Sequence, residues 1–141
     1  LKNYKDVVFC GFGEPTLRLG ALKKIASYVK SQGKPVRLVT NGEGRLIADR
    51  PIAAELKGLV DRVSVSLNAP DGEGYAHICR PVFGLTAYEA VKVFIKECVD
   101  SGIQVEVTCL DFIGNDAICK VREMARSFGA EFRLRHLDKV G

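Results

Sequence analysis

Five strand-like runs of apolar and β-branched residues alternate with helical patterns along the 141 residues of this chain. Apolar residues at helical spacing follow the runs, and glycines such as Gly33, Gly102 and Gly129 are placed to end the helices. This β-α-β alternation predicts a single domain, residues 1–141, with a parallel sheet and helical crossovers. The predicted strands are Val7–Cys10, Val36–Thr40, Val63–Leu67, Gln104–Cys109 and Phe132–Arg135.

The last three predicted strands alternate between apolar and polar side chains. Their polar positions are Ser64, Ser66, Asn68, Glu106, Thr108, Arg133 and Arg135. Strands covered by helices on both faces read apolar throughout. The alternation therefore predicts an α/β fold in which a parallel, five-stranded, curved sheet carries helices on its outer face only. Such a sheet is a segment of a barrel with a polar interior, and a flat sheet with one solvated face is the alternative.

The carboxyl ends of the first four predicted strands are polar or contain glycine. They are Gly11-Phe12-Gly13-Glu14, Thr40-Asn41-Gly42, Ser66-Leu67-Asn68 and Thr108 through Asp111. Ligands of parallel α/β proteins bind outside these ends, so we expect a ligand site there. A carboxylate and free backbone carbonyls in a Gly-rich turn can hold an ammonium group, although Glu14 can equally cap the helix that follows.

Charge and composition exclude several classes of protein. The formal net charge is only +4 and basic residues do not cluster, so nucleic acid is not an expected partner. No apolar run reaches the roughly 18 residues of a membrane span. The five cysteines are widely spaced, which argues against a zinc site or a disulfide framework and predicts free thiols in a cytoplasmic protein.

With these residues placed, the chain resembles the radical S-adenosylmethionine (radical SAM) enzymes. Phe12-Gly13-Glu14-Pro15 is similar to the GGEP motif of the second barrel strand, and Val39-Thr40-Asn41-Gly42 to the TNG turn of the third. The stretch Val63–Asp71, with Tyr75 and Arg80-Pro81, resembles the fourth strand and the segment after it, and Gly102–Thr108 the entry into the fifth. More narrowly, Cys10–Arg18 together with Ser64–Pro70 resembles the TatD-associated subfamily.

The resemblance implies a partial (β/α)6 TIM-like barrel and an enzyme that uses S-adenosylmethionine and a [4Fe–4S] cluster. Family members cleave the cofactor reductively to a 5′-deoxyadenosyl radical, which abstracts hydrogen from a substrate, and an external electron donor supplies the electron. Carried over by position, Gly13 and Glu14 would hold the methionine amino group. Ser66 and Asn68 would face the ribose or the methionine carboxylate, Thr40 and Asn41 would line the same mouth, and Arg80 is a candidate carboxylate clamp.

Two departures from the family pattern stand out. Phe12 replaces the first glycine of GGEP, and no CxxxCxxC cluster motif occurs in the chain. The resemblance begins at the family's second strand, so the first β/α unit and its cluster loop are missing. We therefore expect a C-terminal fragment of a longer enzyme, inactive by itself and without metal ligands of its own. A homologue that never carried a cluster is the alternative.

Other functions and partners follow from the residues alone. A non-redox α/β module that binds a nucleotide or phosphate through the Gly-rich turn is the runner-up, although Glu14 would repel a phosphate. An exposed Val7–Cys10 edge predicts self-association. The candidate substrate residues on the polar face are Arg37, Glu106, Thr108, Arg133 and Arg135. Two arginines there would suit an anionic substrate, or they pair structurally with Glu106 or Glu131.

Overall fold

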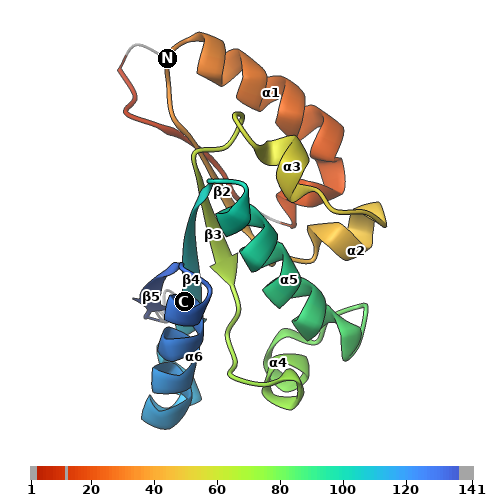
Figure 1. Cartoon of the computed structure of the whole chain (residues 1–141), viewed down its shortest axis with the longest axis vertical. Coiled ribbons are helices and arrows are strands. Elements are labelled where there is room, and N and C mark those ends of the chain that lie inside the picture. Colours follow the sequence, from red (N-terminus) through yellow and green to blue (C-terminus); the bar gives the residue numbers. More distant parts are fainter. Residues whose placement is uncertain (1–2, 12, 137–141) are drawn as a thin grey trace.

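The computed structural model describes residues 3–11 and 13–136, and its centre is one sheet of five parallel strands (Figure 1). The strands are β1 (Val7–Phe9), β2 (Val36–Thr40), β3 (Arg62–Ser66), β4 (Gln104–Leu110) and β5 (Glu131–Arg135). They are hydrogen-bonded in the order β1-β2-β3-β4-β5, which makes β1 and β5 the edges. The predicted sheet is confirmed, with single-residue shifts at several strand ends. Phe12 lies outside the described residues.

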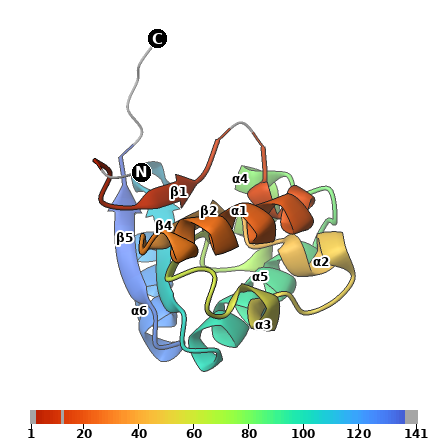
Figure 2. The same ribbon diagram turned by 90° about the horizontal axis from the view of Figure 1, so that it is seen from above.

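Helices connect consecutive strands and gather on one side of the sheet (Figure 2). They are the 3-10 helices η1 (Pro15–Arg18) and η2 (Asp111–Ile113) and the α-helices α1 (Leu19–Ser31), α2 (Gly44–Ala48), α3 (Ala53–Leu56), α4 (Gly72–Cys79), α5 (Thr86–Asp100) and α6 (Asn115–Ser127). Right-handed crossovers that all step in one direction along a sheet place their helices on the same face. The fold is thus the predicted partial barrel with its helices outside.

The core lies between the helices and the apolar face of the sheet. Val63, Val65, Val105 and Val107 are at most 3% exposed, as the strand alternation predicts. Across the described residues, no helix combines the length and the apolar character that a bilayer crossing needs.

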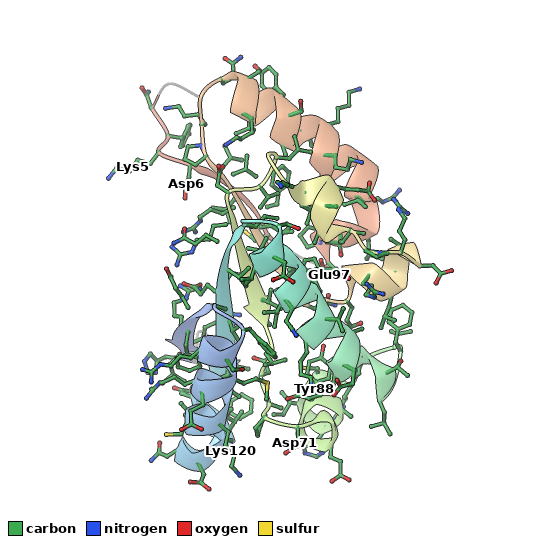
Figure 3. The ribbon with its side chains drawn as sticks, in the orientation of Figure 1. Lys5, Asp6, Asp71, Tyr88, Glu97 and Lys120 are labelled. Carbon is green, nitrogen blue, oxygen red and sulfur yellow. The ribbon has the colours of Figure 1, made fainter. Side chains whose placement is uncertain are left out.

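The α4 and α5 helices are joined by aromatic side chains. The rings of Tyr75 and Tyr88 lie 5.6 Å apart, and the Tyr88 hydroxyl lies 3.4 Å from the carbonyl oxygen of Ala69. Figure 3 shows Tyr88 directed toward the segment that carries Asp71, which caps α4 by accepting a hydrogen bond from the Gly74 N–H at 2.8 Å. These contacts fix α4 beside the carboxyl end of β3.

Some helical predictions were wrong in detail. Leu22, Ile25, Ala26 and Val29 recur at helical spacing, which predicts one apolar stripe, but Ile25 is 49% exposed and only the other three are buried in α1. A threonine before an apolar helical pattern predicts a helix cap at Thr86, but Thr86 is the first residue of α5, and its hydroxyl donates to the carbonyl of Phe83 at 2.8 Å. The α2 helix was not expected at all.

Asp61 joins α1 to the beginning of β2 at the amino end of the sheet. Its Oδ1 accepts from Lys30 Nζ at 2.6 Å and its Oδ2 from the Val36 N–H at 2.7 Å. Burial by itself raises the pKa of Asp61, but these hydrogen bonds outweigh it and lower the pKa below its usual value. Such a carboxylate stabilises the fold above the unfolded-state pKa of about 3.9 and loses that effect as the pH falls.

We expect Asp61→Asn to lower the free energy of unfolding by about 1 kcal/mol near pH 6, because the asparagine keeps the Val36 bond and loses the half-exposed ion pair. The difference from the native chain should shrink as the pH falls below the unfolded-state pKa of about 3.9, and disappear once Asp61 is itself protonated in the folded chain. Urea unfolding across this pH range measures it. Lys30→Met in the Asp61→Asn background should change little further, and a difference that persists at low pH would contradict the role of the charge.

Candidate functional site

Glu14 links the turn after β1 to the carboxyl end of β2. Its Oε1 accepts hydrogen bonds from the N–H and hydroxyl of Thr16 at 3.1 and 2.7 Å and from the hydroxyl of Thr40 at 2.6 Å. Its Oε2 accepts from the Asn41 N–H at 2.7 Å. Glu14 thereby also caps η1, as the sequence allowed. An ionised carboxylate offers about four acceptor positions shared by two oxygens, so Oε2, with one donor, keeps room for another.

The loop after β2 is held by its own polar groups and packs tightly against its neighbours. The Thr40 hydroxyl accepts from the Gly42 N–H at 3.0 Å, and the Asn41 side-chain oxygen accepts from the Glu43 N–H at 2.9 Å. A Cβ on Gly42 would meet methyl groups of Val65 and Val91 at 2.9 Å, at a φ of +82°. Glycine is therefore required here both by the backbone angle and by the close approach.

A hollow of about 330 Å³ opens at this edge of the sheet. It is lined by Gly11, Gly13, Glu14, Val39, Thr40, Asn41 and Ser66. A second hollow of about 420 Å³ beside the same turn shares Gly11, Gly13 and Glu14 with it. The structure thus brings together five of the predicted cofactor-binding residues: Gly13, Glu14, Thr40, Asn41 and Ser66.

The other two predicted cofactor residues lie elsewhere along the same edge. The Asn68 side-chain amide donates to the sulfur of Cys79 at 3.6 Å, which ties the end of β3 to the end of α4. Arg80 follows as the exposed C-cap of α4. Both residues adopt positive φ angles, +61° and +46°. Neither lines the hollow, so their cofactor roles stay predictions.

A buried acidic residue close to this hollow was missed from the sequence. Glu43 is 6% exposed and accepts a hydrogen bond at 2.9 Å from the hydroxyl of Tyr75, which is 1% exposed. Burial, followed by the charge of Glu43, raises the pKa of Tyr75 well above its usual value. Burial likewise raises the pKa of the Cys79 thiol, partly offset by the Asn68 hydrogen bond. The position of Glu43 directly after Thr40-Asn41-Gly42 was the available signal.

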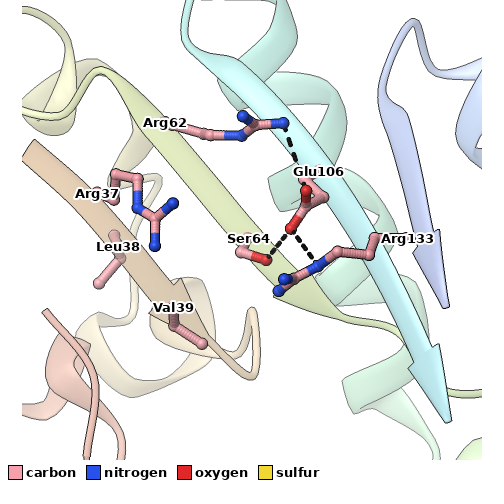
Figure 4. A pocket seen from close by; sticks show the side chains of 7 residues that line it. All are labelled: Arg37, Leu38, Val39, Arg62, Ser64, Glu106 and Arg133. Atoms are coloured by element: carbon pink, nitrogen blue, oxygen red, sulfur yellow. Dashed lines mark hydrogen bonds and ion pairs between the residues drawn. The ribbon is translucent and has the colours of Figure 1, made fainter. Parts of the chain in front are cut away.

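The face of the sheet opposite the helices carries a second polar cluster around Glu106 (Figure 4). Glu106 Oε1 lies 2.8 Å from the Ser64 hydroxyl and 3.0 Å from Arg133 Nε, while its Oε2 lies 3.3 Å from Arg62 Nη2. Arg62 also pairs with Glu131. Arg133 therefore makes the structural ion pair that the sequence left open. Arg62 was missed because the predicted strand began one residue later.

The remaining substrate candidates lie at different depths on this face. Thr108 is 1% exposed, and its hydroxyl lies 3.4 Å from the carbonyl oxygen of Val65. Arg135 is exposed at the carboxyl end of β5. Beside it, His136 Nδ1 lies 2.9 Å from Asp111 Oδ2, a contact between the ends of β5 and β4 that the sequence analysis did not anticipate.

The described residues do not fit a [4Fe–4S] cluster. Among them, no three His, Cys, Asp or Glu side chains gather closely enough to hold a metal ion. Cys98 and Cys109 are buried in the core, and burial raises the pKa of these thiols to about 12 and about 11. A thiolate is the form that ligates iron. The hollow around Glu14 does fit the methionine end of S-adenosylmethionine, since a carboxylate oxygen with a vacant acceptor position suits an ammonium group.

Comparison with known proteins gives one family. The model of the radical SAM superfamily matches residues 1–127. No curated protein matches the chain.

Among solved structures, 14 chains match. One is a radical SAM methyltransferase from Sphaerobacter thermophilus, at 15% identity and a TM-score of 0.57. The match covers 96% of the present chain and 52% of that protein, so this chain spans about half of that relative's length. NosK from Streptomyces actuosus matches at 15% identity and a TM-score of 0.34, over 94% of this chain and 71% of its own. The methyltransferase match supports the fold described above.

Proposed function

Because this chain belongs to the radical SAM superfamily, we propose that it forms the S-adenosylmethionine-binding part of a radical SAM enzyme. The hollow around Glu14 carries this proposal. There a carboxylate, two glycines and the hydroxyl-bearing residues Thr40 and Ser66 meet at the carboxyl ends of three parallel strands. This is the edge where parallel α/β proteins bind ligands.

Each residue of the hollow has a distinct task in this proposal. Glu14 Oε2 accepts a hydrogen bond from the ammonium group of the ligand's methionine. The Thr40 hydroxyl and the Asn41 N–H hold the Glu14 carboxylate in position for this. Gly11 and Gly13, which have positive φ angles and open space beside them, let the ligand approach the backbone. Ser66 offers its hydroxyl from the end of β3. S-adenosylmethionine held in this way would supply the radical chemistry of hydrogen abstraction.

The finer assignments belong to the same proposal. The segments 10–18 and 64–70 favour the TatD-associated subfamily. Since no CxxxCxxC motif occurs in these 141 residues, we propose that the cluster ligands lie elsewhere in a longer cytoplasmic enzyme that receives its electron from an external donor. The runner-up, a nucleotide-binding module, is disfavoured because the Glu14 carboxylate faces the ligand position.

Calorimetric titration tests the binding role of the chain. We expect S-adenosylmethionine to bind more tightly than ATP, because Glu14 attracts the ammonium group and repels phosphates. Tighter binding of ATP would support the nucleotide-binding module instead.

We also predict that the 141-residue chain forms no 5′-deoxyadenosine when it is incubated with S-adenosylmethionine and dithionite, because it lacks the cluster motif. Chromatographic detection of the product measures this. The longer protein, reconstituted with iron and sulfide without air, should form it. Product formation by the short chain, or no cluster in the long one, would contradict the assignment.

A further inference from the structure

We infer that the sheet face opposite the helices binds the carboxylate or phosphate group of a small anionic substrate, through Arg37, Arg62 and Arg133. The identification of the anion as a substrate rests on the proposed function, whereas the anion site itself is argued from residues of the sheet. The site is a small hollow of about 50 Å³, lined by Arg37, Leu38, Val39, Arg62, Ser64, Glu106 and Arg133 (Figure 4). We call it the arginine hollow.

Strand register builds the arginine hollow in layers. Arg37 of β2 pairs in register with Arg62 of β3, and Ser64 pairs with Glu106 one layer further along the strands. In the next layer Thr108 is in register with both Ser66 and Arg133. The strands β2, β3 and β5 thus direct guanidinium groups toward one place, on rigid elements and not on loops.

Hydrogen-bond capacity favours an acceptor-rich ligand. A guanidinium has five N–H donors and no acceptor, so the three arginines carry more donors than the carboxylates of their partners Asp6, Glu106 and Glu131 can accept. The ion pairs of Arg37 and Arg133 are made through Nε, to Asp6 at 3.1 Å and to Glu106 at 3.0 Å. Figure 4 shows the Arg37 and Arg133 side chains extending toward β3 from its two sides. An oxyanion in the hollow would accept from the terminal nitrogens of these guanidinium groups, whose planar fork matches carboxylate and phosphate.

The ion pairs already present do not close the arginine hollow. The Arg37 and Asp6 side chains are 47% and 36% exposed and the Arg133 side chain is 57% exposed. The Arg37–Asp6 pair is exposed on both sides and therefore weak, whereas Glu106 is only 14% exposed, so a ligand can take over the Arg37 guanidinium group most readily. The small volume suits one oxyanion group of a small molecule.

The arginine hollow adjoins the hollow around Glu14. Val39 lines both hollows. Ser66, which lines the Glu14 hollow, and Arg133 are both in register with Thr108, so they lie in the same layer of the sheet. A substrate anchored by its anionic end on the arginines would extend along the sheet toward the proposed cofactor. Adjacent sites for substrate and cofactor are what hydrogen abstraction requires.

Titration of the 15N-labelled chain with inorganic phosphate, and separately with acetate, tests the anion site. The NMR signals of the guanidinium Nε–H groups of Arg37, Arg62 and Arg133 should shift in a saturable way, with the tighter ligand showing which oxyanion the hollow prefers. Arg133→Gln should weaken binding about tenfold, the loss of one charged hydrogen-bond donor group. Arg126→Gln, which removes an exposed charge from α6, should leave the affinity unchanged.

Glu106→Gln should change the anion affinity in the opposite direction to Arg133→Gln, which separates binding at this site from general charge effects. It removes the internal competitor for Arg62 and Arg133, so anion affinity should rise several-fold. Equal weakening by Arg133→Gln and Arg126→Gln, or no saturable shift with either anion, would overturn the anion site. Phosphate binding without S-adenosylmethionine binding would overturn the proposed function and leave the site, whereas the reverse result would overturn the site alone.

Discussion

Replacing Glu14 by alanine is expected to lower the free energy of unfolding by about 3 kcal/mol and to abolish S-adenosylmethionine binding. The change removes the acceptor of four hydrogen bonds. Thr16 and Thr40, which supply three of the donors, are 2% and 3% exposed. Buried donors left without an acceptor cost about 1–3 kcal/mol each, less where water can enter. Urea unfolding and calorimetric titration measure the two effects.

Glu14→Gln separates the structural role of this residue from its role in binding. The amide oxygen can keep the bonds from Thr16 and Thr40, while the amide nitrogen faces the Asn41 N–H, donor against donor. We expect a loss of about 1 kcal/mol in stability and at least tenfold weaker binding, because the charge that attracts the ammonium group is gone. Glu123→Gln, an exposed change on α6, is the matched control. Unchanged affinity in Glu14→Gln would contradict the cofactor role.

Much of the fold follows from the sequence because its periodicity is strong. Alternation such as Val63-Ser64-Val65-Ser66 predicts a sheet with one apolar and one polar face, and the structure has both. Parallel topology also places Glu14 and Thr40 at the same edge, because the carboxyl ends of parallel strands meet there. These are backbone consequences of the pattern, which local residue types suffice to predict.

Side-chain partners are harder to predict, because they depend on which direction each group takes in the folded chain. The sequence does not distinguish a Glu14 carboxylate that is free to bind a ligand from one that is already hydrogen-bonded to Thr16, Thr40 and Asn41. Glu43 reads as a solvated loop residue, since glutamate is seldom buried, yet it is buried against Tyr75. Such placements result from packing between segments far apart in the chain.

Gly42→Ala is expected to lower the free energy of unfolding by about 3 kcal/mol. Its positive φ costs an alanine about 1–2 kcal/mol, and the added Cβ would meet Val65 and Val91, both fully buried, at 2.9 Å. Crowding of this kind in a core costs about 1–3 kcal/mol. Because the Gly42 N–H bonds to the Thr40 hydroxyl that holds Glu14, S-adenosylmethionine binding should weaken as well. Urea unfolding and calorimetric titration measure the two losses.

Gly102→Ala is the matched control for the backbone term. Gly102 has nearly the same φ, +79° against +82°, but no atom lies within 4 Å of its Cβ position. It should therefore cost only the backbone term, about 1–2 kcal/mol, and leave binding unchanged. Val91→Ala in the Gly42→Ala background removes two of the crowded methyl groups, so the double variant should be more stable than the sum of the single losses predicts, by about 1 kcal/mol. Strict additivity would mean that crowding at Val91 does not cause the loss.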